Sequence, residues 1–111
     1  MFEKLNRNSA RSVKEGIDLQ TLTFRKLKEF IGHTLVVDGF FFTTGEFGKQ
    51  VVVVANGYKI NMPSRAVEQF EEIYNDPEML QAVLDGKLAI NGIEQVRTKK
   101  GLTISYNLVD R

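Results

Sequence analysis

Two kinds of residue in this 111-residue chain have types and spacing suited to binding: cations near loops, and aromatic rings beside them. Binding a single-stranded nucleic acid without regard to sequence requires cations along the phosphates. It also requires flat rings on which bases stack, at about 1–3 kcal/mol per base. The candidates fall in four short segments: Phe40 and Phe42; Phe47 and Lys49; Lys59 and Asn61; and Arg97, Lys99 and Lys100.

Residues that support catalysis are sparse. The single histidine, His33, follows Gly32 and has no predictable nucleophile or carboxylate partner. The chain has no cysteines, which excludes disulfides and thiolate zinc sites. The segment 45–49 (GEFGK) lacks the length and the Ser or Thr of a phosphate-binding loop. We therefore expect a non-enzymatic protein with no metal and no cofactor.

Charge is unevenly distributed along the chain, although the net charge is only +1. Residues 63–86 carry a net charge of −5, whereas residues 21–32 carry +2 and residues 87–111 carry +3. Such segregation can present a cationic face to an anionic ligand while the total stays near zero. The alternative is that the acidic segment is simply the solvated face of a helix.

The strongest local signal is Asn56-Gly57 between two segments rich in β-formers, QVVVVA and YKINM. It predicts a two-residue type I′ turn, in which both central residues have φ > 0. The turn sets Ala55 opposite Tyr58 and divides the side chains between two faces. The predicted core face holds Val51, Val53, Ala55, Tyr58, Ile60 and Met62, and the partly exposed face holds Val52, Val54, Lys59 and Asn61.

The other elements follow from similar patterns. Residues 33–44 predict a long strand that bends at Gly39, and residues 87–98 and 102–110 predict a hairpin with a bulge at Gly92. In the last strand Leu102, Ile104, Tyr106 and Leu108 alternate with polar residues, so we place them in the core. Residues 21–31 predict a helix that stops at Gly32. Residues 64–85 predict a broken helical pair, with Ser64 and Asp76 as N-caps.

The predicted order is helix, three strands, two helices, two strands. This is a mainly β fold with helices: a five-stranded oligonucleotide/oligosaccharide-binding (OB) type antiparallel barrel with a helical insert between its third and fourth strands. Residues 27–110 resemble, by element order, hairpins and glycines, the small OB-fold single-stranded DNA-binding proteins of phages and mobile elements. The resemblance implies single-stranded DNA as ligand and replication or recombination proteins as partners. A homo-oligomer is an alternative assembly, with Val52, Val54 and exposed phenylalanines as its dimer patch.

Residues 1–20 are polar and without sustained periodicity, so we expect a mobile basic arm (Lys4, Arg7, Arg11, Lys14) ahead of a domain over 21–111. No apolar run approaches the roughly 20 residues of a membrane span, and the N-terminus lacks a secretory signal. We expect a cytoplasmic protein that does not enter a membrane.

Several candidates also have a structural interpretation. Neighbouring residues of a strand face opposite sides, so either Phe41 or the pair Phe40 and Phe42 must point away from the core, unless the N-terminal helix buries both faces. Phe47 can plug its own loop, and Lys99-Lys100-Gly101 is common at hairpin tips. The rival function is a protein-interaction module on the same small barrel, since fold alone does not give function.

Overall fold

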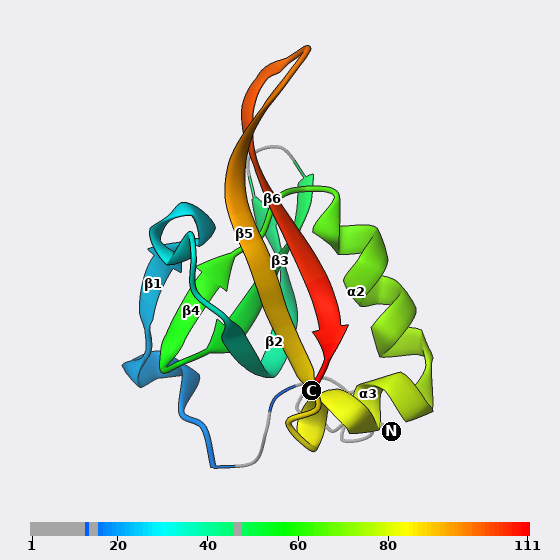
Figure 1. The fold of residues 1–111 in the computed structure, drawn as a ribbon. Coiled ribbons are helices and arrows are strands. Elements are labelled where there is room, and N and C mark those ends of the chain that lie inside the picture. Colours follow the sequence, from blue (N-terminus) through cyan, green and yellow to red (C-terminus); the bar gives the residue numbers. More distant parts are fainter. Residues whose placement is uncertain (1–12, 14–15, 46–47) are drawn as a thin grey trace.

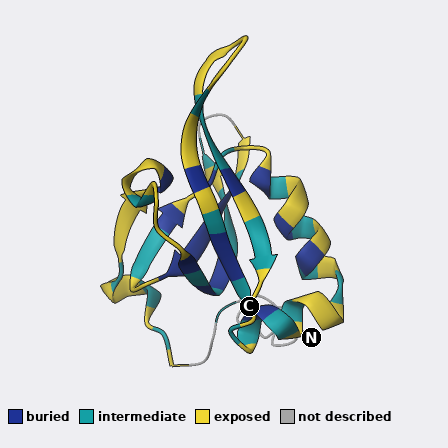
Figure 2. Cartoon of the chain, in the orientation of Figure 1, coloured by how far each residue is buried: buried dark blue, intermediate teal, exposed yellow. Residues whose placement is uncertain are grey.

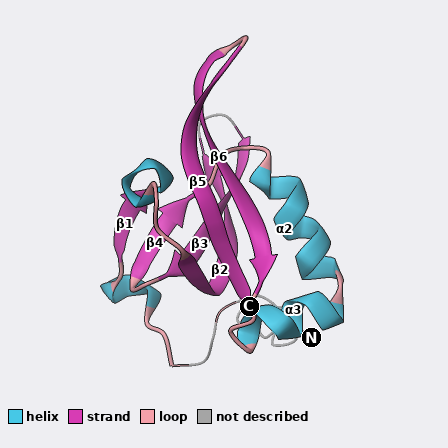
Figure 3. Ribbon diagram, viewed as in Figure 1, coloured by secondary structure: helices cyan, strands magenta, loops and turns pink. Residues whose placement is uncertain are grey.

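The computed structural model describes residues 13, 16–45 and 48–111. Its fold is mainly β, with six strands in a curled half-barrel sheet and two α-helices beside it (Figures 1 and 3). The strands are β1 (Thr23–Lys26), β2 (Leu35–Gly45), β3 (Gly48–Ala55), β4 (Tyr58–Asn61), β5 (Leu88–Thr98) and β6 (Gly101–Asp110). The helices are α2 (Ala66–Asn75) and α3 (Pro77–Leu84), and two 3-10 helices are η1 (Leu19–Thr21) and η2 (Leu27–Phe30).

The prediction of a mainly β fold with helices is confirmed, and the predicted number of strands was wrong. The sheet order is β1-β4-β3-β2-β5-β6. Adjacent pairs are antiparallel except β1–β4, which is parallel. Two residue pairs, Leu35↔Ile90 and Val36↔Ala89, join β2 to β5 and so connect the two halves of the sheet.

The predicted helix over 21–31 does not form. Residues 23–26 are extended as β1 and pair with β4, and only residues 27–30 turn into η2. The Glu29 carboxylate accepts a hydrogen bond from the Lys26 backbone N–H at 2.7 Å, which begins η2 at that point. Hydrogen bonding to the free edge of β4 outweighs the weak helical preference of this short segment.

The ribbon of β3 and β4 forms as the Asn-Gly turn predicts. Asn56 has φ 52° and Gly57 has φ 81°, and the register sets Ala55 opposite Tyr58 and Val53 opposite Ile60. Val51, Val53 and Ile60 are fully buried in the core. The same register assigns Val52 and Val54 to the other face of the sheet, as expected.

The expected partial exposure of that other face holds for Asn61, which is exposed, and for the half-buried Lys59. It was wrong for Val52 and Val54, which are each only 1% exposed. In the register Phe41 lies opposite Val52 and Lys59 lies opposite Val54. Both of these longer side chains are themselves half-buried. Paired positions place their side chains on one face, so Phe41 lies beside Val52 and Lys59 beside Val54.

The helical pair over 64–85 is confirmed, with one correction at its start. Asp76 caps α3, its carboxylate accepting from the N–H groups of Glu78 and Met79, with Pro77 at the first helical position. Ser64 does not cap α2: Arg65 holds the N-cap position without a side-chain cap, and Ser64 offers only its backbone carbonyl, to the N–H of Val67.

The core lies between the concave side of the sheet and α2, as the dark blue segments of Figure 2 indicate. The ring of Phe70 on α2 lies 4.9 Å from that of Phe40 on β2. Register shifts after Val37 and after Asn91 confirm the two glycine-associated bulges, at Gly39 and Gly92. These bends allow β2 and β5 to curl around the core.

The β5–β6 hairpin continues past the body of the domain, at the top of Figure 1. We call its distal part, residues 96–103, the arm. Leu102, which we expected in the core, is 63% exposed because it lies on the arm, beyond the elements that could cover it. The other three apolar positions of that alternation, Ile104, Tyr106 and Leu108, do contact the core.

Part of the expected N-terminal arm lies outside the described residues, including Lys4, Arg7, Arg11 and Lys14. Within residues 1–20, Val13 forms an isolated bridge with Gly39, and Asp18 caps η1. Within the described part of the chain, no helix has the length and apolar character needed to cross a membrane.

Candidate nucleic-acid interface

The structure separates the predicted site residues into three places. Phe40, Phe42 and Lys49 lie on the face of the sheet that packs against α2. Lys59 and Asn61 lie on the opposite face of the same ribbon. The three cations of the last hairpin are on or beside the arm, and Phe47 lies outside the described residues.

Phe40 is a core residue, which corrects its assignment to a binding surface. Its side chain is 0% exposed and contacts the rings of Phe42, Phe70 and Tyr74. Phe42 is half-buried beside Phe40, and the Lys49 ammonium lies 4.5 Å from the centre of its ring. Phe40 is therefore closed to a base by burial, and Phe42 is exposed only in part.

Lys49 is already paired. Its Nζ lies 2.7 Å from Glu71 Oε1 on α2, and both side chains remain substantially exposed. A solvated pair of this kind contributes little to stability, on the order of 0–1 kcal/mol. It does place a carboxylate where a phosphate would have to approach, so Lys49 is a weaker anchor than its sequence position indicates.

Lys59 is also in contact with a ring, but on the outer face. Its ammonium lies 4.3 Å from the centre of the Phe24 ring, and Phe24 is 50% exposed. Phe24 and Lys59 are opposite each other in the parallel β1–β4 ladder. Sequence reasoning missed Phe24 because it assigned this residue to the apolar side of a helix.

The arm carries three exposed cations. Arg97, Lys99 and Lys100 are all exposed, and none of them has a carboxylate partner among the described residues. Arg97 pairs with Leu102 across the hairpin, so the two side chains share the face of β6 that also includes Ile104. Thr98 accepts from the Lys100 N–H and donates to the Gly101 carbonyl, which orders the tip.

A hollow of about 330 Å3 lies at the foot of the arm, between η2, the end of β4 and β6. Two lysines, an amide and a hydroxyl line it together with four apolar residues. The lining residues are Lys26, Leu27, Lys28, Asn61, Met62, Pro63, Thr103 and Ile104. Only Asn61 was identified from the sequence as a site residue. The sequence pattern assigned Lys26 and Lys28 to the polar face of a helix, and it gave no indication that they lie beside β6.

Arg65 closes this region on the α2 side. Its Nη2 donates to the carbonyl oxygen of Ile104 at 2.6 Å, and its guanidinium lies 5.0 Å from the centre of the Tyr106 ring. The Tyr106 hydroxyl donates to Gln69 Oε1 on α2 at 2.5 Å. Burial raises the pKa of the Tyr106 phenol, and the nearby positive charge of Arg65 partly opposes that rise.

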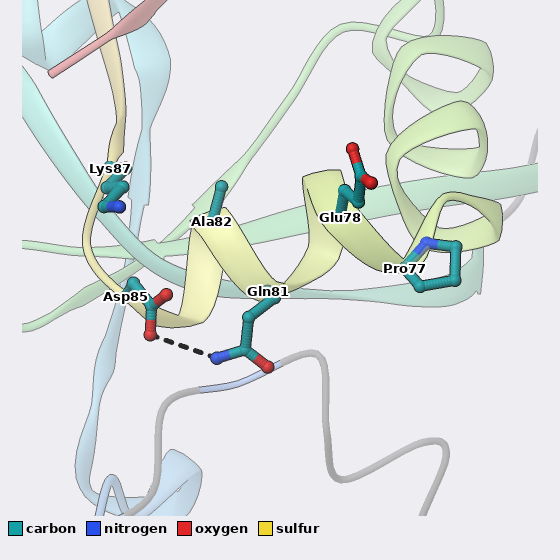
Figure 4. A pocket seen from close by; sticks show the side chains of 6 residues that line it. All are labelled: Pro77, Glu78, Gln81, Ala82, Asp85 and Lys87. Atoms are coloured by element: carbon teal, nitrogen blue, oxygen red, sulfur yellow. Dashed lines mark hydrogen bonds between the residues drawn. The ribbon is translucent and has the colours of Figure 1, made fainter.

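A second hollow, of about 380 Å3, lies along α3 (Figure 4). Its charged lining consists of Glu78, Asp85 and Lys87, and Gln81 Nε2 donates to Asp85 at 3.0 Å. Two carboxylates against one lysine do not suit a phosphate. Of the two hollows, the cationic one beside the arm is the better site for an anionic polymer.

Comparison with known proteins found no matching family model, no matching curated protein and no matching solved structure. Among the described residues, no group of three or more His, Asp or Glu side chains is arranged to hold a metal ion.

Proposed function

We propose that this protein binds single-stranded DNA, largely without sequence preference, along a path from the arm to the hollow between η2, β4 and β6. We further propose that it is a non-enzymatic protein that acts with replication or recombination proteins of a phage or mobile element, in the host cytoplasm. The DNA path is supported by contacts and charge, and the biological setting rests on the sequence resemblance.

The observation that carries the proposal is the continuity of cations along β6 and its neighbours. Lys26 and Lys28 line the hollow, Arg65 bonds to β6 beside it, and Arg97, Lys99 and Lys100 extend the positive charge along the arm. The acidic residues of 68–85 lie on α2 and α3 and the turns that end them. Phosphate contacts dominate affinity for nucleic acid, so this separation of charge favours an anionic strand on one side of the molecule.

The strand order supports an OB-like interpretation. Without β1, the order β4-β3-β2-β5-β6, with both helices between β4 and β5, is compatible with a partly open five-stranded barrel. OB folds bind oligonucleotides across the face of their second and third strands, between two loops. Here that face corresponds to β3 and β4, where Lys59 lies, with Phe24 of β1 opposite it.

The test is a titration of the full chain against fluorescent oligo-dT, duplex DNA and single-stranded RNA at two salt concentrations. We expect micromolar or tighter binding to oligo-dT that weakens steeply with salt, because bound cations displace counterions. The double variant Lys99→Gln/Lys100→Gln should lower the slope of log affinity against log salt by about 1.4, at roughly 0.7 per phosphate contact on a single strand.

The matched control is Lys87→Gln/Arg111→Gln, which removes the same charge near the opposite end of the hairpin. Binding that is insensitive to salt, or an equal loss in both double variants, would contradict the proposed path. No binding at micromolar protein would remove the function itself.

A second candidate is a protein-interaction module or a homo-oligomer. It is favoured by four exposed apolar side chains among the described residues: Phe24, Ile31, Met79 and Leu102. The charge reversal Lys99→Glu/Lys100→Glu separates the two functions. It should abolish DNA binding under the first and leave self-association, measured by sedimentation, unchanged under the second.

A further inference from the structure

We propose that the hollow between η2, β4 and β6 receives one base of the bound strand and reads its edge through Asn61 and Thr103. The inference rests on the proposed function and adds to it: one position of an otherwise sequence-tolerant site discriminates between bases.

The polar groups of the hollow are available for a ligand. Within residues 16–45 and 48–111, neither the Asn61 amide nor the Thr103 hydroxyl has a hydrogen-bond partner. An asparagine side chain offers two donors and an acceptor, and a threonine hydroxyl offers one donor and two acceptor positions. Base edges combine donors and acceptors in the same way, whereas a phosphate only accepts. A paired donor and acceptor therefore suit a base better than they suit the backbone of the strand.

The remaining surface of the hollow is apolar. Leu27 and Met62 are almost fully buried beneath it, and Pro63 and Ile104 complete the lining. Its volume of about 330 Å3 is near the lower end of the range for small-molecule sites, about 300–1,000 Å3. A flat heterocycle can cover the half-buried Pro63 and Ile104 and remove their remaining surface from water, with its polar edge turned to Asn61.

The charges of the hollow suit the phosphates on either side of such a base. Lys26 and Lys28 supply two cations, and no carboxylate is among the lining residues. The nearest acidic residue in sequence, Glu29, has its carboxylate engaged by the backbone N–H of Lys26. Thr103 also belongs to the arm, opposite Val96, so a strand leaving the hollow meets Arg97 next along the same hairpin.

The test compares oligo-dT, oligo-dC and oligo-dA of equal length with the full chain at one salt concentration, before and after Asn61→Ala. We expect the wild type to distinguish the homopolymers, and the variant to lose about threefold to tenfold affinity for the preferred one, as loss of one net hydrogen bond implies. Its affinity for the poorest homopolymer and its salt dependence should stay unchanged. Thr103→Val, which replaces the hydroxyl with a methyl group, should also reduce the differences in affinity between the homopolymers.

Asn75→Ala at the end of α2 is the matched control, an exposed asparagine on the acidic side of the molecule. Lys26→Gln/Lys28→Gln should reduce the salt dependence without narrowing the differences between homopolymers. If Asn61→Ala and Thr103→Val both bind every homopolymer as the wild type does, the base site is wrong while strand binding stands. If the wild type binds no single strand, the proposed function fails.

Discussion

Arg65 holds its guanidinium 5.0 Å from the centre of the Tyr106 ring and donates to the backbone of β6 two residues earlier, at Ile104. One side chain from the loop before α2 therefore fixes the outer strand of the sheet to the helical layer. Hydrogen bonds from a charged donor to a backbone carbonyl contribute more to stability than neutral ones. Removing this contact therefore tests how strongly β6 is held to the helical layer.

We expect Arg65→Ala to lower the free energy of unfolding by about 1–2 kcal/mol, because the Ile104 carbonyl and the Tyr106 ring both lose their cationic partner. Urea denaturation followed by circular dichroism measures this. Arg25→Ala is the control, since its guanidinium also lies over a ring, Tyr58, but on the exposed strand β1. Equal midpoints for wild type and Arg65→Ala would contradict the bridging role.

Stability should fall at alkaline pH through Tyr106. Burial raises the pKa of its phenol above the ordinary value near 10, so the folded state holds this proton more tightly than the unfolded chain. The stabilisation that the protonated Tyr106 phenol contributes is therefore fully present below about pH 10. It is lost as the pH rises through the folded-state pKa of that phenol. Urea midpoints between pH 8 and 11 should decline less steeply for Tyr106→Phe than for the wild type. Parallel curves would show that this phenol is not responsible.

Substitution of the buried Phe40 should affect stability, whereas substitution of the half-exposed Phe24 should mainly affect DNA binding. Phe40→Ala should lower the free energy of unfolding by about 3–5 kcal/mol, the usual loss for a large ring removed from a packed core. Phe24→Ala, at a half-exposed ring, should change stability by less than about 1 kcal/mol and weaken oligo-dT binding, because a base can stack on that ring. Thermal melts and titrations of both variants check this. A stable Phe40→Ala protein would contradict the placement of β2.

The turn between β3 and β4 is a site where backbone conformation alone should decide the outcome. Gly57 has φ 81°, and an added Cβ would meet nothing within 4 Å. Gly57→Ala should therefore lower the free energy of unfolding by about 1–2 kcal/mol through the left-handed backbone alone. Chemical denaturation measures it, and Asn56→Gly, which keeps the conformation accessible, should be close to neutral. A neutral Gly57→Ala would mean that the type I′ turn is wrong.

Lys49 should matter less for DNA than the arm does. Its ammonium is held by Glu71 and by the Phe42 ring, so Lys49→Gln should weaken oligo-dT binding less than Lys99→Gln does. Glu71→Gln, which frees the same ammonium, should strengthen binding and increase its salt dependence. Fluorescence titration of the three variants at two salt concentrations ranks them. A larger loss for Lys49→Gln would place the strand beside α2 instead.

How far the sequence predicts this molecule depends on whether the deciding contacts are local. Asn56-Gly57 determines its turn and register by itself, and Asp76-Pro77 determines the start of α3, because each acts within a few residues. The helix predicted over 21–31 failed because its fate depends on the edge of β4, more than thirty residues away. The prediction of Leu102 as a core residue was wrong for a related reason. Its alternation is that of a core strand, but nothing in the sequence indicates that the hairpin extends beyond the rest of the domain.

The candidate site divides in the same way. The cations of the last hairpin were found because a hairpin tip is exposed by geometry. Lys26, Lys28 and Thr103 were missed because only the curl of the sheet brings residues 26–28 next to residues 103–104. The consecutive phenylalanines, 40 to 42, could be divided between two faces but not assigned to one. That assignment depends on which face receives α2.

The arm lies outside the hydrophobic core, so the length of the arm can change without disturbing that core. No residue of 96–103 belongs to the hydrophobic core, and the pairs Val96↔Thr103, Arg97↔Leu102 and Thr98↔Gly101 extend the hairpin beyond the pairs that join β5 to β2. Each matched pair added or deleted changes the reach of the tip by roughly 3.3 Å and turns its side chains to the opposite face. Short symmetric insertions could thus alter how far the tip extends and which face its side chains occupy, without changing the packing of the hydrophobic core.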